Sequence, residues 1–111
     1  MKTFSAADLA TPDEGPKRWL IHTERTRIAS LVLDGSVQVP VHAHAESDEL
    51  FYFITGRARV RDEHGEFLAG PGDAVALEPG TFHTIDVVEG PVLLLAIVAP
   101  NVDDTRQRDA L

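Results

Sequence analysis

The sequence contains no cysteine among its 111 residues. A disulfide framework and a metal site built from thiolates are therefore both excluded. Basic residues are also few, with 10 Lys and Arg against 18 Asp and Glu, which leaves a formal net charge of −8. This balance argues against nucleic acid or an anionic membrane as a partner, since both need a basic surface.

Long apolar segments are missing as well. No run approaches the roughly 20 residues of a membrane-spanning helix, and the N-terminus, Met1 to Ser5, lacks the apolar core of a secretory signal. These absences predict a cytoplasmic protein with no membrane partner. Hydrophobic residues make up 43% of the chain and charged residues 25%, and the length predicts a single domain, residues 1–111.

The sequence also has no convincing long amphipathic helix. Short β-type segments alternate instead with turns that contain Gly or Pro. The predicted strands are residues 17–22, 26–33, 37–44, 49–54, 57–62, 66–68, 74–77, 83–88 and 92–98. Residues 1–17 are predicted to form a loosely attached arm and residues 100–111 a surface arm or frayed end. This pattern predicts an all-β sandwich or barrel.

Two histidines in a predicted strand are the most informative residues. His42 and His44 are two positions apart, so both imidazoles leave the same face of the strand. Glu49 opens the next strand after a short polar link, and a third imidazole is available at His83. Neutral imidazoles and a carboxylate suit a divalent Mn, Fe, Co, Ni, Cu or Zn ion and give Mg or Ca little advantage.

Each of these candidate ligands also has an interpretation without metal. The two strand histidines could be ordinary strand residues. Glu49 could face solvent, with Glu46 or Asp48 as the ligand in its place, although only Glu49 fits the spacing. His83 could cap a turn or belong to the core.

Other side chains near these segments have alternative roles too. Phe51 and Phe53 alternate onto the same face as Glu49 and could wall a pocket or simply form core. His22 could line the mouth of the site as an acid or base, while His64 is predicted at a surface turn. Three arginines share one face of a predicted strand and could clamp a carboxylate, although a solvated face is favoured: Arg57, Arg59 and Arg61.

These residues resemble the two sequence motifs of the cupin family. The first motif is matched by Gly35, His42, His44, Glu49 and Gly56, and the second by Gly72, Gly80 and His83. The segment Pro79-Gly80-Thr81-Phe82-His83 is its most recognisable part. Two positions depart from the pattern, since Glu78 replaces the usual proline and Val87 a frequent asparagine. The resemblance covers about residues 35–87 in detail.

The resemblance implies a double-stranded β-helix, or jelly-roll, barrel that forms a homodimer. It also implies that His42, His44, Glu49 and His83 hold a metal ion, whose identity among Mn, Fe, Ni, Cu and Zn stays open. Small cupins include dioxygenases, decarboxylases, isomerases and members with no known catalysis, so fold and ligands do not choose the reaction.

The leading functional hypothesis is an oxidative, dioxygenase-like enzyme that acts on a small organic acid or a phenolic or enolic compound. One alternative is a non-catalytic module that binds a metal or small ligand, and another is a cupin isomerase or decarboxylase. The sequence identifies no independent general base, so the catalytic residues beyond the metal ligands are unknown.

Overall fold

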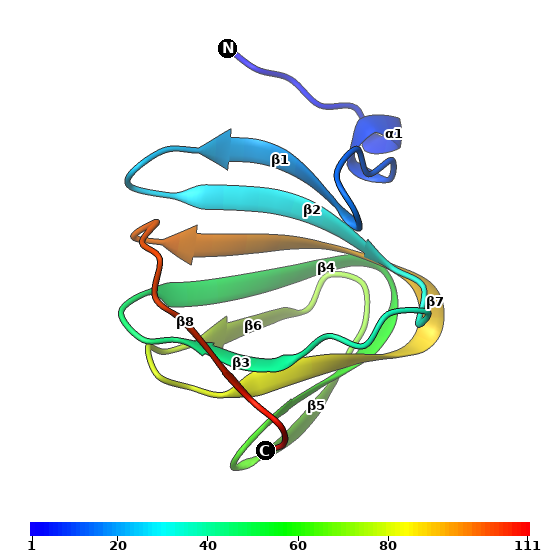
Figure 1. Ribbon diagram of the computed structural model, residues 1–111. Helices are drawn as coiled ribbons and strands as arrows, with labels where there is room; N and C mark the ends of the chain where they lie inside the picture. The colour runs from blue at the N-terminus through cyan, green and yellow to red at the C-terminus, as the bar shows by residue number, and fades with distance from the viewer.

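Eight strands and one short helix make up the computed structural model, which describes residues 1–111 (Figure 1). The strands are β1 (Lys17–His22), β2 (Arg27–Leu33), β3 (Val41–His44), β4 (Asp48–Asp62), β5 (Gly65–Ala69), β6 (Ala74–Leu77), β7 (His83–Ala99) and β8 (Thr105–Arg108). The helix α1 (Ala6–Leu9) precedes them. The antiparallel strands curl into a barrel, which confirms the predicted all-β jelly roll.

Two long strands, β4 and β7, organise the barrel. They pair antiparallel from Asp48↔Ala99 to Asp62↔His83 and curve together around one side of the molecule (Figure 1). The sequence prediction divided each of them into two shorter strands, and that division was wrong. Irregular register between Phe53 and Ala58 absorbs the turn at Gly56, so the ladder bends without ending.

Strand β3 is shorter than predicted. It begins at Val41, so residues 37–40 of the predicted strand lie outside it. Pro40 has no N–H to donate to a sheet ladder, which explains why the strand begins just after it.

Strand β8 corrects the prediction of a surface arm or frayed end at the C-terminus. Its residues pair with β3 from Val41↔Arg108 to His44↔Thr105, and the sheet runs in the order β1-β2-β7-β3-β8. All four residues of β8 are exposed and polar. Backbone pairing and polar or cationic side-chain contacts, such as Arg108 over the Phe82 ring, hold this strand, so it has no apolar alternation that a sequence could reveal.

Alternating side chains of β4 supply much of the apolar core. Phe51 and Phe53 are buried, while Tyr52 between them faces outward. Val60 on β4, and Leu94 on β7, belong to the same cluster of buried apolar residues. Burying each of these large side chains stabilises the fold by roughly 1.5–3 kcal/mol.

Arg18 is one of the residues that attach the N-terminal arm to the barrel. Arg18 on β1 donates from Nε to the carbonyl oxygens of Asp8 and Thr11, both 2.9 Å away. Ser5 caps α1 by accepting from the backbone N–H of Asp8. Strand β1 pairs only with β2 and therefore forms a free sheet edge, where a second subunit could add a strand. The homodimer itself stays a prediction.

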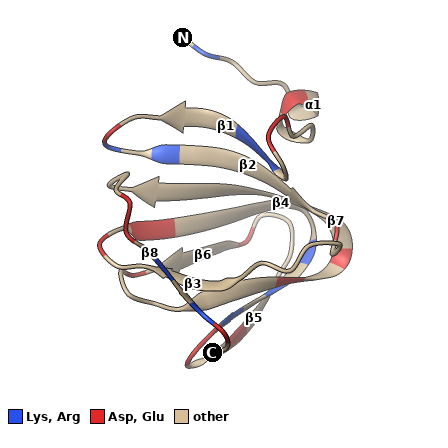
Figure 2. Cartoon of the chain, viewed as in Figure 1, with Lys and Arg blue, Asp and Glu red and all other residues tan.

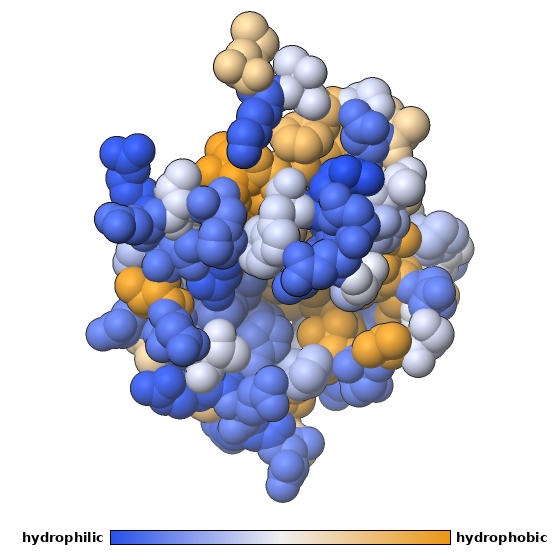
Figure 3. All heavy atoms as spheres, turned by 45° about the horizontal axis from the view of Figure 1, so that its top comes forward, coloured by the Kyte–Doolittle hydropathy of each residue, from blue (hydrophilic) through white to orange (hydrophobic).

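Charged residues occur on many of the strands and loops (Figure 2). Acidic segments lie at several loops and strand ends, and basic segments occur on β1 and β2 (Figure 2). Apolar atoms show as separate patches among hydrophilic ones on the face seen in Figure 3. The helix α1 has four residues, and no helix here has the length and apolar character needed to span a bilayer.

Candidate metal centre

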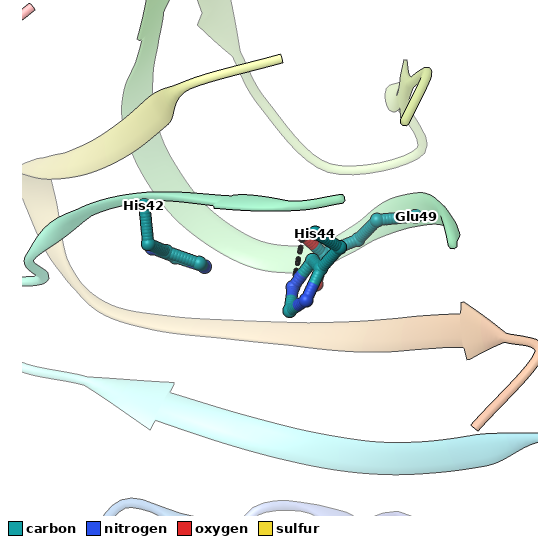
Figure 4. Close-up of side chains that lie close together, drawn as sticks. All are labelled: His42, His44 and Glu49. Carbon is teal, nitrogen blue, oxygen red and sulfur yellow. Dashed lines mark ion pairs between the residues drawn. The ribbon is translucent and has the colours of Figure 1, made fainter. Parts of the chain in front are cut away.

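His42 and His44 on β3 and Glu49 on β4 converge inside the barrel (Figure 4). One ligand atom from each of the three residues lies within 4.8 Å of the others. Strand alternation places both imidazoles on one face of β3, as the spacing predicts. His44 and Glu49 are each only 7% exposed, and His42 is half-buried. The structure therefore brings together three of the four predicted ligands as a group that could hold an ion.

The fourth predicted ligand, His83, reaches the same carboxylate from the first residue of β7. It pairs with His42 in the sheet and is fully buried. Its Nε2 lies 2.9 Å from Glu49 Oε1, and His44 Nε2 lies 3.3 Å from the same oxygen. The Glu49 carboxylate thus lies between two imidazoles.

Backbone carbonyls fix the orientation of two of the imidazoles. His42 Nδ1 lies 2.8 Å from the carbonyl oxygen of Pro40, and His83 Nδ1 lies 2.9 Å from that of Thr81. A carbonyl oxygen can only accept, so each Nδ1 donates its hydrogen to it. The Nε2 lone pair of each ring is then left for a ligand, which is the arrangement typical of metal-binding histidines.

The third imidazole, His44, meets a different set of partners at Nδ1. Thr105 Oγ1 and Arg27 Nη2 each lie 3.4 Å away, and Asp104 Oδ1 lies 3.6 Å away. Asp104 is 2% exposed. Its other carboxylate oxygen accepts from Ser47 Oγ and from the backbone N–H of Glu46. The sequence analysis missed this support, because its residues come from separate segments with no shared motif.

Two buried atoms of the site indicate whether the site suits a metal ion. Glu49 Oε1 and His83 Nε2 have no hydrogen-bond partner. With a hydrogen on His83 Nδ1, the Nε2 lone pair faces a carboxylate oxygen at 2.9 Å, and two acceptors at this distance repel each other unless a proton or cation lies between them. The nitrogen and oxygen donor set therefore fits a divalent transition metal.

The electrostatics of the ligand set explain the protonation of its members. Burial raises the pKa of Glu49, but the contacts with His44 and His83 outweigh burial and lower that pKa to about 2. Conversely, the contact with Glu49 raises the pKa of His44. Burial lowers the pKa of His42 and favours its neutral, metal-binding form.

These shifts predict how the stability of the metal-free protein depends on pH. The folded pKa of Glu49 lies below its ordinary value of 4.5, so its contribution is present above pH 4.5 and is lost as the pH falls toward 2. The folded pKa of His44 lies above its ordinary value of 6.5, so its contribution is present below pH 6.5 and is lost as the pH rises through the folded value.

The folded pKa of His42 lies below its ordinary value of 6.5, so its contribution is present above pH 6.5 and is lost as the pH falls, which opposes the contribution of His44. Urea unfolding of the metal-free protein should therefore show its clearest change on the acid side, as a fall in the free energy of unfolding below about pH 4.5. The acid limb should fall by an amount on the order of 2–3 kcal/mol. Glu49→Gln is the control, because it removes the carboxylate whose pKa is lowered and should flatten the acid limb. A variant profile identical to that of the wild type would contradict this account.

A small cavity of about 170 Å³ opens beside His42, His44 and Glu49. Its other lining residues come from β1, β2 and β7: Lys17, Trp19, Arg27, Ala29, Leu31, Ala96 and Val98. The walls are thus partly apolar, and the three candidate ligands supply every carboxylate and imidazole that lines them. Larger hollows of about 290, 350 and 600 Å³ contain none of these ligands in their walls, and the one of 350 Å³ shares Lys17, Trp19 and Arg27 with the small cavity.

The remaining sequence candidates lie outside the ligand set. His22 is exposed, and its ring packs edge-on against Trp19 with ring centroids 4.8 Å apart. His64 is exposed at the turn between β4 and β5. Arg59 and Arg61 pair with acidic side chains away from the cavity, which supports the solvated face over the carboxylate clamp.

Phe51 takes the core role of the two considered for it. It belongs to the buried core, and its ring centroid lies 5.7 Å from that of His83 in an edge-on arrangement. Phe53 is fully buried in the same core cluster. Neither residue lines the small cavity, so Phe51 supports a candidate ligand from behind rather than walling the pocket.

The family model for the cupin domain matches residues 29–98, and the chain belongs to the cupin family. The matched range contains the four predicted ligands. It does not include β1, β8, Lys17, Arg27 or Asp104. No curated protein matches the chain.

Three solved structures illustrate the similarity of the fold. TT1209 from Thermus thermophilus is 27% identical, with a TM-score of 0.77, and the match covers 90% of this chain and 98% of that one. An uncharacterized conserved protein with a double-stranded β-helix domain from Klebsiella pneumoniae is 17% identical, with a TM-score of 0.81 and 99% of each chain covered. The DMSP lyase DddQ from Ruegeria pomeroyi is 20% identical, with a TM-score of 0.67 over 77% of this chain and 44% of that chain.

Proposed function

We propose that this cupin holds one divalent Mn, Fe, Ni, Cu or Zn ion through His42, His44, Glu49 and His83. The observation that carries the proposal is the pair of buried acceptors, His83 Nε2 and Glu49 Oε1, which face each other without a hydrogen bond. The ligand atoms of His42, His44 and Glu49 within 4.8 Å of one another support it further. A cation shared by these atoms relieves the repulsion between them.

We further propose that the site acts on a small organic acid or a phenolic or enolic compound in an oxidative reaction. When bound, the ion would supply Lewis acidity and a binding position for an anionic oxygen. The charge of the ion exceeds the single negative charge of Glu49, so the site favours anions. The apolar side chains beside the ligands limit the access of water and accept the carbon skeleton of a small molecule.

A second candidate function is a module that binds the metal and a small ligand without catalysis. It is favoured by the composition of the cavity, which offers few groups for acid–base catalysis. Apart from the candidate ligands, the indole of Trp19 and the permanently charged Arg27, Lys17 is the one lining residue with an exchangeable proton. Lyase chemistry is a further possibility of the same site, since one structural neighbour is named a DMSP lyase.

The metal-loaded protein, tested against small carboxylic, phenolic and enolic acids, should consume dioxygen in step with loss of one class of substrate. An oxygen electrode and NMR of the same samples give the two measurements. The His42→Ala, His44→Ala double variant serves as the control and should be inactive. Conversion without oxygen uptake would replace the oxidative reaction by lyase, isomerase or decarboxylase chemistry, and binding without conversion would favour the non-catalytic module.

A further inference from the structure

Two cations line the small cavity beside the candidate metal ligands, and neither has an acidic partner. Lys17 begins β1 and Arg27 begins β2, where Figure 2 shows basic segments. No carboxylate lies within 4 Å of either cation, whereas four other arginines form ion pairs: Arg18, Arg59, Arg61 and Arg108. In a chain with a net charge of −8, unpaired and partly buried cations at one cavity point to an anionic ligand.

Neighbouring groups hold these cations in place. Arg27 donates from Nη1 to Asn101 Oδ1 at 2.8 Å and to the carbonyl oxygen of Val102 at 3.4 Å. Lys17 Nζ lies 4.7 Å from the centre of the Trp19 ring, and Trp19 Nε1 donates to Glu14 Oε2 at 3.1 Å. Charges positioned before binding cost less entropy when a ligand arrives.

Apolar residues lie between Lys17 and the metal ligands along the sheet, whereas Arg27 reaches a ligand directly, with its Nη2 3.4 Å from His44 Nδ1. Ala29 and Leu31 on β2 and Ala96 and Val98 on β7 line the cavity, and β2 and β7 lie between β1 and β3 in the sheet order. The cavity, at about 170 Å³, is smaller than the roughly 300–1,000 Å³ typical of drug-sized ligands. The part of a ligand that lies between Lys17 and the metal ligands must therefore be small and apolar.

We propose that the preferred ligand is a short aliphatic dicarboxylate. One carboxylate lies at the metal, and the second lies at Lys17 and Arg27, whose guanidinium suits a planar carboxylate. This inference rests on the proposed function and narrows its substrate class. Both cations lie outside residues 29–98, the range that matches the cupin family model.

Calorimetry with succinate and butyrate tests the proposal, because the two acids have the same number of carbons and differ in the second carboxylate. Wild-type protein loaded with the metal should bind succinate at least about tenfold more tightly than butyrate. Lys17→Met keeps the apolar stem and should remove most of that preference, with butyrate binding unchanged. Lys17→Arg should keep the preference, and Arg27→Gln should reduce it.

Lys2→Met is the matched control, since Lys2 is exposed on the N-terminal arm and does not line the cavity. Melting curves verify that each variant is folded. Equal binding of the two acids by the wild type, or an unchanged preference in Lys17→Met, would overturn the proposal. Two results separate this proposal from the proposed metal site. A chain that takes up no metal contradicts the metal site. A preference for succinate in metal-free protein that depends on Lys17 still supports an anion site at the two cations.

Discussion

Protein with His42→Ala and His44→Ala should contain no bound metal when the wild type contains about one equivalent per chain. The double substitution removes two of four ligands from one face of β3. Glu49 and His83 remain in contact with each other, but two donors bind a divalent transition metal far more weakly than four. We expect the affinity to fall by more than about a thousandfold, beyond the 10- to 100-fold loss typical of outer-shell changes.

Elemental analysis of the purified proteins and a titration against a chelator of known affinity measure this effect. The matched control is the His22→Ala, His64→Ala variant, which removes two exposed histidines outside the site and should keep its full metal content. Retention of metal by the first variant, or its loss from the control, would count against the assigned ligands. Wild-type protein without metal in any preparation or after reconstitution would exclude the metal site altogether.

Gly56→Ala should destabilise the protein by about 3–5 kcal/mol, at the upper end for a single substitution. Gly56 has φ +78, and a Cβ built there would lie 2.5 Å from the carbonyl oxygen of Pro91 and 2.8 Å from that of Glu89. These atoms belong to the backbone of β7 and cannot move without disturbing the long β4–β7 ladder. The glycine permits the close approach at which both long strands bend.

Gly72→Ala is the control for the effect of the backbone angle alone. Gly72 has φ +88, but a Cβ there would meet nothing within 4 Å, so about 1–2 kcal/mol is expected. Urea unfolding of both variants, followed by circular dichroism, gives the comparison. Equal losses of stability would show that the contacts of Gly56 with β7 do not matter.

Local periodicity explains why the shared face of His42 and His44 could be predicted, whereas Glu49 and His83 were predicted as ligands from the resemblance to the cupin motifs. His42 and His44 share a face because the strand period is two, and this holds in any sheet. Phe51 and Phe53 are buried and Tyr52 is exposed for the same reason. The ends of strands were harder to predict, because β4 continues through Gly56 and β7 through Gly90 and Pro91 in the pairing of two long strands.

Residues that support the site from other segments could not be predicted in this way. Asp104 lies in a polar, acidic C-terminal segment, and that composition predicts exposure to solvent. In the structure Asp104 is buried beside His44. Its burial follows from the pairing of β8 with β3. The residues of β8 are all exposed and show no alternation of apolar and polar residues from which this pairing could be predicted. Lys17 and Arg27 likewise look like ordinary surface cations until β1 and β2 bring them to one cavity.

The sequence by itself determined the all-β class, the shared face of His42 and His44, and the donor types that suit a transition metal. These properties depend on residue chemistry and on the geometry of a single strand. Only the tertiary structure decided that His83 meets Glu49, that Asp104 lies behind His44, and that two unpaired cations line the neighbouring cavity. Each of these contacts joins strands far apart in the chain, and their register is set by the packing of the whole barrel.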